Sequence, residues 1–241
     1  MRNKLALAVL LCAVGCGAVA AAEPLAYWPL EAIQDGLVAD ASGHGHEARA
    51  CGLDGKQPQV VPGIVGNCLK FTAASEQYLE IKHNEGLLAP AALSVLAWIK
   101  PAARSATYEI LGNKGDKSGR GPWPGWRLRY FWSRATFQFG AADSSEPAVS
   151  SAEWSVPAGF WSHVAVTYDG RWLRMYVDCE LVQEQEIAAK ILASTRPLVI
   201  GNYVGRKNAY ALDGLLDEVK VFGTVLSAEE IYAEAARGMT P

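Results

Sequence analysis

The sequence predicts an all-β fold in which two antiparallel sheets pack as a sandwich, with one short C-terminal helix. Many short segments are rich in branched and aromatic residues and mostly alternate apolar with polar positions, as half-buried strands do. Gly, Pro, Asn, Asp and Ser cluster between these segments at hairpin-like spacing. Because no helical segments separate them, a parallel βαβ fold is excluded and an antiparallel sandwich or jelly roll is favoured.

The segments with the strand pattern extend along almost the whole chain. They are residues 25–30, 68–72, 78–82, 93–101, 108–114, 126–131, 135–140, 161–169, 172–178, 197–203 and 215–222. The expected helix follows the last of them, because Ser227 and Glu230 stand at capping-box spacing and Gly238 is a stop signal. Without a linker, repeat or low-complexity stretch, residues 23–241 are expected to form one domain.

The first residues have the composition of an export signal. Arg2 and Lys4 precede an apolar run, and small residues that suit a signal peptidase follow it. We therefore expect residues 1–22 to be a signal peptide, the mature chain to lack a transmembrane segment, and the location to be periplasmic, extracellular or at the cell surface. The segment that ends at Cys16 resembles a lipobox, so lipoprotein anchoring through Cys16 is an alternative.

Charge and cysteine content limit the partners and the covalent links. A formal net charge of -3 with scattered Lys and Arg gives no reason to expect nucleic acid or an anionic membrane as partner. Removal of the signal would leave Cys51, Cys68 and Cys179 in an oxidising compartment. Cys51 and Cys68 bracket a short loop between segments expected to be neighbouring strands, so they are the preferred disulfide. Three unpaired buried thiols are the alternative.

Several segments occur in an order that points to a known family. They are AYWPLE, VADASGHGHEA, VPGIVGNCLKF, YLEI, LSVLAWIKP, WSHVAVTYDGRWLRMYVDCELV and PLVIGNYVGRKNAYALDGLLDEVKVFGTVLSAEEI. Together they resemble the laminin G-like, or concanavalin A-like lectin/glucanase, jelly roll of secreted bacterial proteins. The resemblance implies that AYWPL pairs with DEVKVF, with Glu218 and Lys220 mostly facing water. It also implies a DG turn where this chain has Asp178 and Cys179.

Catalysis is not expected. Enzymatic members of the glucanase branch need carboxylates spaced as ExDxE or ExDxxE, and neither spacing occurs in this chain. No GxSxG nucleophile motif occurs either. The chain is therefore expected not to be an enzyme, with a divergent glycan-active enzyme as the least favoured class.

The segment VADASGHGHEARA holds the candidate metal ligands. His44 and His46 could chelate a transition metal from alternate positions, but a complete site needs further ligands. The resemblance brings Asp40 near Asp217, because the first and last strands pair, and so implies a structural Ca²⁺ between them. The alternative is that Asp40 accepts hydrogen bonds from the amides of its own turn.

Exposed aromatic residues on loops indicate glycan binding, because sugar faces stack on aromatic rings. The stretch GRGPWPGWRLRYFW is the densest aromatic region, so Arg120, Trp123 and Trp132 form one candidate surface, with Arg127 or Arg129 beside them. A second loop offers Tyr203, Arg206, Asn208 and Tyr210. The alternative for Trp123 is a loop anchor.

The function expected from these features is that of an exported, non-catalytic carbohydrate-binding or adhesion module. Its partner would be a polysaccharide or glycan, and structural calcium would stabilise it. The alternative is a protein-interaction or structural domain of the cell envelope, because the same fold often binds proteins.

Overall fold

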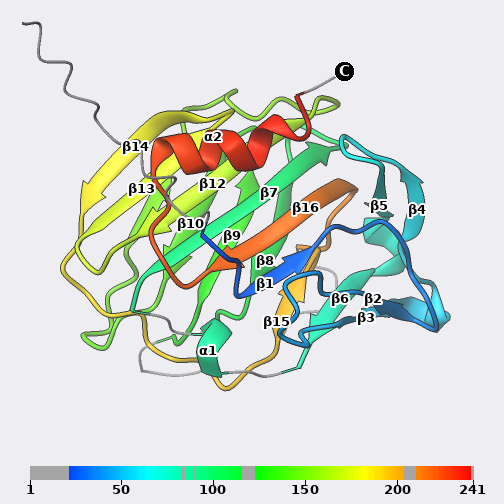
Figure 1. Ribbon diagram of the computed structural model, residues 1–241, viewed down its shortest axis with the longest axis horizontal. Coiled ribbons are helices and arrows are strands. Elements are labelled where there is room, and N and C mark those ends of the chain that lie inside the picture. Colours follow the sequence, from blue (N-terminus) through cyan, green and yellow to red (C-terminus); the bar gives the residue numbers. More distant parts are fainter. Residues whose placement is uncertain (1–21, 83–84, 89–90, 116–122, 204–209, 240–241) are drawn as a thin grey trace, which may run out of the picture.

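The computed structural model of this 241-residue chain describes residues 22–82, 85–88, 91–115, 123–203 and 210–239. Residues 1–21 of the expected signal peptide, with Cys16, lie outside these ranges, and export stays a prediction. Within the described ranges no helix is long and apolar enough to cross a membrane. The predicted fold class is confirmed, since two antiparallel eight-stranded sheets form a sandwich with a helix over one of them (Figure 1).

The two sheets are called sheet A and sheet B. Sheet A has the order β14 (Glu180–Glu186), β13 (Trp172–Val177), β12 (Ser162–Tyr168), β7 (Leu93–Pro101), β16 (Gly214–Phe222), β5 (Asn67–Phe71) and β4 (Gln59–Pro62), and β1 (Ala26–Trp28) also pairs with β16. Sheet B has the order β11 (Ala148–Ser150), β10 (Ala135–Phe139), β9 (Trp126–Phe131), β8 (Thr107–Gly112), β15 (Leu198–Ile200), β6 (Tyr78–Ile81), β3 (Ala48–Cys51) and β2 (Leu37–Val38). The helices are α1 (Glu85–Leu88) and α2 (Ala228–Ala236).

Strand β16 joins the two ends of the chain. It pairs with β1 in an antiparallel register that sets Tyr27 opposite Lys220, which confirms the pairing of the two segments that the family resemblance implied. On the same side, its first residues pair with β5, and its other side pairs with β7. The register shifts between Asp217 and Lys220, where Glu218 has a φ of 51°. This bulge therefore lies where the neighbour of β16 changes from β5 to β1.

The main core lies between the sheets. Trp28 and Phe71 from sheet A and Trp126 and Phe137 from sheet B have no exposed surface. Their positions follow from the alternation along each strand, which turns every second side chain inward. Burial of such large aromatic side chains provides the main favourable free energy of this fold.

Helix α2 covers the outer face of sheet A (Figure 1). The predicted capping box is present, because the Ser227 hydroxyl accepts from the Glu230 amide at 3.2 Å and the Glu230 carboxylate accepts from the Ser227 amide at 2.7 Å. Below the helix, Ile231 packs with Leu96 and Phe222 in a second, smaller apolar cluster.

The expectation that Glu218 and Lys220 face water is wrong. Lys220 Nζ lies 2.8 Å from Glu218 and 2.8 Å from Glu234 of α2, and both residues of β16 are almost fully buried. The Tyr27 hydroxyl donates to Glu218 at 2.6 Å. Burial, followed by this contact, raises the pKa of Tyr27. The charges are buried because α2 covers this part of the sheet, and they are tolerated because they are paired.

Asp217 connects β16 to the turn that joins β4 and β5. Its Oδ2 accepts from the amides of Ile64 and Val65 at 2.9 and 3.0 Å. Its Oδ1 is buried and has no hydrogen-bond partner in the described part of the chain. Burial therefore raises the pKa of Asp217 to about 7, although the two amides oppose the change.

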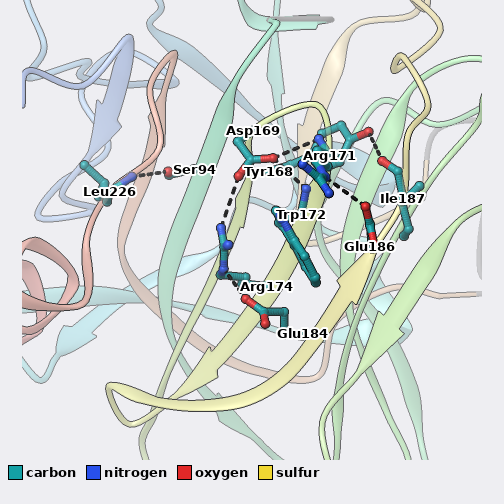
Figure 2. A network of polar contacts seen from close by, with 10 residues as sticks. All are labelled: Ser94, Tyr168, Asp169, Arg171, Trp172, Arg174, Glu184, Glu186, Ile187 and Leu226. Atoms are coloured by element: carbon teal, nitrogen blue, oxygen red, sulfur yellow. Dashed lines mark hydrogen bonds and ion pairs between the residues drawn. The ribbon is translucent and has the colours of Figure 1, made fainter.

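The β12–β13–β14 edge of sheet A is charged (Figure 2). Asp169 accepts from the Arg171 amide at 2.8 Å and from Arg174 Nη1 at 3.2 Å. Arg174 also pairs with Glu184, and Arg171 pairs with Glu186. Strand β14 is exposed along most of its length, so its acidic side chains lie at the surface.

The turn between β13 and β14 departs from the implied DG pattern but keeps its shape. Asp178 and Cys179 both have positive φ, 48° and 70°, which is the conformation of a type I′ hairpin turn. Asp178 Oδ1 accepts from the His163 amide at 2.8 Å and so fixes the turn to β12. Cys179 thus occupies a left-handed position that glycine normally takes.

The expected disulfide between Cys51 and Cys68 is absent from this structure. Cys51 lies in β3 of sheet B and Cys68 in β5 of sheet A, so they are not on neighbouring strands. Packed sheets are about 10 Å apart, whereas a disulfide needs Cα atoms within about 7 Å. Both thiols are free, as is Cys179. The alternative of unpaired thiols therefore describes this structure.

Removal of the Lys220 charge should lower the free energy of unfolding, because it leaves buried carboxylates without their cation. We expect Lys220→Met to lower the free energy of unfolding by about 3–5 kcal/mol, because Glu218 would stay buried without its cation. The double variant with Glu218→Gln should recover part of this loss. Arg171→Met is the matched control, since its pair with Glu186 is exposed and should contribute less than about 1 kcal/mol. Equal losses in urea unfolding for the two single variants would contradict this account.

The raised pKa of Asp217 predicts a pH effect on stability. The folded state binds a proton more tightly than the unfolded chain, so wild type should lose stability as the pH rises from about 4 to 7. Asp217→Asn cannot ionise and should gain about 1–2 kcal/mol relative to wild type between pH 5 and pH 8. Urea unfolding at several pH values measures this difference. Parallel stability curves for the two proteins would refute the assignment.

Candidate functional site

Polar side chains gather on the outer face of sheet B, around β8, β9 and β10. Along β9 the side chains of Trp126, Leu128 and Tyr130 point into the core. Arg127 and Arg129 alternate with them and therefore point to the opposite face. We call the set Glu109, Lys114, Arg127, Arg129, Gln138 and Glu146 the polar face.

Glu109 lies directly opposite Arg129 in the β8–β9 register. A register shift follows it, so that Ile110 and Leu111 both reach the core. The side chain of Glu109 is buried, and its Oε2 has no hydrogen-bond partner within the described ranges. Burial raises the pKa of Glu109 to about 7, although Arg127 and Arg129 oppose this change.

Arg127 is held by neutral groups. Its Nη2 and Nε donate to Gln138 Oε1 of β10 at 2.7 and 3.2 Å. Its guanidinium carbon lies 5.6 Å from the ring centroid of Tyr203, which follows β15. Tyr203 in turn makes an edge contact with Tyr210, with ring centroids 5.6 Å apart. The structure thus places the predicted residue Tyr203 against a strand arginine.

Gly112 leaves room for Arg127 on this face. The two residues are opposite each other in the β8–β9 register. A Cβ at Gly112 would lie 2.7 Å from the Cβ of Arg127, closer than side chains normally approach. A larger residue at this position would therefore displace the arginine or the strand.

Trp123 borders the polar face at the start of β9. Its carbonyl accepts from Lys114 Nζ at 3.4 Å, and the same amine lies 5.4 Å from its ring centroid. The chain at Trp123 passes so close to Gly140 that a Cβ there would collide with the Trp123 carbonyl. Lys114 also forms an ion pair with Glu146. Trp123 is thus both an anchored loop residue and a half-exposed ring beside charged groups.

The sequence-predicted aromatic surface does not form one patch. Trp132 lies in the β9–β10 turn and is 51% exposed, whereas Trp123 precedes β9. A six-residue strand spans about 20 Å, so the two rings lie at opposite ends of it. Arg120, Arg206 and Asn208 lie outside the described residues. Sequence reasoning therefore placed Trp123 and Trp132 together only because they are near in the chain.

Asp40 is saturated by donors from its own turn and from β1. Its Oδ1 accepts from the amides of Tyr27 and Ser42, and its Oδ2 accepts from the Ser42 hydroxyl and the His46 amide, at 2.8–3.0 Å. Burial raises the pKa of Asp40, but these bonds outweigh it, so the net pKa lies below its ordinary value. This is the turn role that the sequence left as the alternative.

The proposed calcium pair does not fit this geometry. Asp217 accepts from Ile64 and Val65, so the two carboxylates share no hydrogen-bond partner. Both oxygens of Asp40 already face N–H and O–H donors. Across the described ranges, no group of three or more His, Cys, Asp and Glu side chains is arranged to hold a metal ion. Calcium binding stays a prediction, without support from these two side chains.

The histidines have structural positions. His163 is buried against the ring of Trp98, with centroids 5.3 Å apart, and burial followed by the charge of Lys220 lowers its pKa to about 3. It is therefore a neutral core residue. His44 and His46 lie near each other, with ring centroids 6.4 Å apart, beside the turn that Asp40 stabilises.

The family follows from a match over most of the chain. Residues 73–232 match the family described as Laminin_G_3, the Concanavalin A-like lectin/glucanases superfamily. This chain belongs to that superfamily. None of the curated proteins matches it at a significant level.

Solved structures with the same concanavalin A-like fold include binding domains of larger proteins. One is domain 4 of AbnA, a GH43 extracellular arabinanase from Geobacillus stearothermophilus, in complex with arabinotriose, with a TM-score of 0.67, 15% identity, and 89% of this chain and 99% of that chain covered. Another is the binding domain of Paraclostridial Mosquitocidal Protein 1, with a TM-score of 0.66, 12% identity, and coverage of 88% and 51%. A third is the receptor binding domain of botulinum neurotoxin D, with a TM-score of 0.61, 16% identity, and coverage of 88% and 52%. This chain thus spans about half the length of the toxin domains.

Sequence reasoning missed several members of the polar face of this concanavalin A-like chain. Glu109, Lys114, Gln138 and Glu146 carry no motif, and they meet only because β8, β9 and β10 are adjacent. The alternation in WRLRYF already showed that Arg127 and Arg129 share a face. A hairpin register for β8 and β9 would have added Glu109, but the shift after it hides that register in the sequence.

The hydrogen bonds of Asp40 predict its effect on stability. We expect Asp40→Ala to lower the free energy of unfolding by about 2–4 kcal/mol, because four donors would lose a charged acceptor. The loss should be the same in a chelator and in calcium, as measured by thermal unfolding. Calcium-dependent stabilisation of wild type that vanishes in both Asp40→Ala and Asp217→Ala would instead establish a shared ion.

Proposed function

We propose that this chain is an exported, non-catalytic carbohydrate-binding module that holds a polysaccharide or glycan on the polar face of sheet B. The observation that carries the proposal is the position of Arg127. It lies on the outward face of β9 between the amide of Gln138 and the ring of Tyr203. Sugar recognition uses this combination of planar polar donors and aromatic rings, because hydroxyl groups need hydrogen bonds while C–H faces need apolar contact.

The other residues of the site suit the same role. Trp123 offers a half-exposed ring at the border of the polar face, next to Lys114. Strands β8, β9 and β10 form a rigid base, since each is paired on both sides. A face fixed in this way binds a ligand with little loss of conformational entropy.

Similar structures support a binding role through the fold. Domain 4 of the arabinanase was solved with arabinotriose, and the toxin domains are named as binding or receptor-binding domains. At 12–16% identity these likenesses concern the fold and not the ligand. The ligand class of this chain therefore rests on its own side chains.

The carboxylates of the polar face favour binding over hydrolysis. Retaining and inverting glycosidases use two carboxyl groups, one as acid and the other as nucleophile or base. Here Glu146 is engaged by Lys114 and receives a further bond from Gln138 at 3.4 Å. Glu109 is enclosed below the arginines and is not exposed. We therefore assign neither residue a catalytic role.

Loss of the Trp123 ring should weaken glycan binding. We expect retention of wild type on at least one member of a polysaccharide panel, and about tenfold weaker binding by Trp123→Ala, because one stacking contact contributes about 1–2 kcal/mol. Trp154→Ala is the matched control, since Trp154 is an exposed tryptophan packed under Arg104, away from the polar face. Lack of retention on every glycan would reject the proposal and favour an envelope-protein partner.

A further inference from the structure

The cationic side chains of the polar face differ in whether a carboxylate pairs with them. Lys114 is almost fully buried and forms an ion pair with Glu146, so these two charges cancel. Arg127 donates to Gln138, which carries no charge. Within the described ranges, neither Arg127 nor Arg129 has a carboxylate within ion-pair distance. Two guanidinium groups therefore lie on one strand face without a carboxylate ion-pair partner among the described residues.

Arg129 has the least satisfied guanidinium. Its guanidinium carbon lies 5.6 Å from the ring centroid of Phe131, which supports it from one side. Its Nε is buried and has no hydrogen-bond partner in the part of the chain that the structure describes. Burial, and then repulsion from Arg127, lowers the pKa of Arg129, so its charge is held at a cost. An anion that accepted from this group would remove that cost.

Glu109 does not act as the anion that accepts a hydrogen bond from the buried Arg129 Nε. Although it lies opposite Arg129 in the register, its Oε2 makes no hydrogen bond to the arginine. Burial raises its pKa to about 7, so near neutral pH it carries less negative charge than an ordinary glutamate. The groups that face it are Arg127 and Arg129 from β9 and Lys114 from the end of β8, while its amide donates to the Tyr210 carbonyl.

We propose that the polar face selects an acidic glycan, in which the carboxylate of a uronic acid pairs with Arg129 and Arg127. This inference rests on the proposed function and adds the class of sugar. A guanidinium group matches a carboxylate with two parallel hydrogen bonds, and the partly exposed ring of Trp123 offers apolar contact for the sugar ring, while the buried Tyr203 supports Arg127. The formal net charge of the whole chain is -3, so general attraction of polyanions is not expected.

The position of Glu109 adds a pH dependence. As the pH rises through 7, Glu109 ionises and supplies the negative charge that the ligand would supply. Affinity for the uronate should therefore fall between pH 6 and pH 8. In Glu109→Gln the affinity should not change across this range, because the side chain keeps its shape without ionising.

Binding to polygalacturonate and to its fully methyl-esterified form tests the inference, because the sugar backbone is the same and each carboxylate is replaced by an uncharged methyl ester. We expect wild type to bind the acid about tenfold more tightly than the ester. Arg129→Gln and Arg127→Gln should each lose most of this preference while still unfolding in one cooperative thermal transition. The control is Arg49→Gln, an exposed arginine of β3 paired with Glu80, and it should bind as wild type does.

The alternative outcomes separate the two proposals. Equal binding of the acid and the ester would overturn the proposed selectivity for a uronic acid and leave the proposed carbohydrate-binding function standing. Acid binding that persists in Arg129→Gln, or is lost equally in Arg49→Gln, would also overturn it. Retention on dextran sulfate but not on polygalacturonate would overturn the uronic acid proposal and show that the site selects a sulfated glycan instead. Lack of binding to acidic and neutral glycans alike would reject the proposed function itself.

Discussion

The pairing of β16 with three other strands is the constraint on which the rest of the structure depends. Its residues pair with β7 on one side, while β5 and β1 divide the other side between them. The bulge at Glu218 separates these two neighbours, and Asp217 fixes the β4–β5 turn beside it. Strands from both ends of the chain thus meet at one short segment, which closes sheet A over the core.

The two outer faces of the sandwich differ in whether their charged side chains form ion pairs. Over sheet A, helix α2 covers Glu218 and Lys220, and Glu234 completes a network in which each charge has a partner. Over sheet B, Lys114 and Glu146 are paired, but among the described residues Arg127 and Arg129 form no ion pair, although Glu109 lies opposite Arg129. The proposed ligand therefore lies on the second face, where the partly buried Arg129 keeps an Nε without a hydrogen-bond partner among the described residues.

Local signals in the sequence were sufficient for the fold class and the cap of α2, whereas the pairing of the first and last strands was implied by the family resemblance. Alternation and the Ser227 capping box act within a few residues, so they can be read from the chain. The burial of Lys220 depends on a helix that returns from later in the chain, and solvation of a charged position cannot be inferred from alternation alone. Cys51 and Cys68 were assigned to neighbouring strands because the division of strands between two sheets is a long-range property.

The candidate site was predicted only in part for the same reason. Tyr203 and Arg127 were each named from the sequence, yet their contact joins the loop after β15 to strand β9. Trp132 was grouped with Trp123 by sequence distance, although a strand separates them. Glu109 escaped notice because a register shift conceals its position opposite Arg129.

The acidic edge strand β14 has a consequence for the behaviour of many copies together. An exposed edge strand is a template for pairing with another molecule. A second β14 added antiparallel would set glutamates of the two copies about 5 Å apart, where like charges repel. The unpaired backbone groups of this edge strand are thus protected from pairing with another copy by the charges of Glu180, Glu184 and Glu186. Edge-to-edge pairing of two copies through β14 is therefore disfavoured.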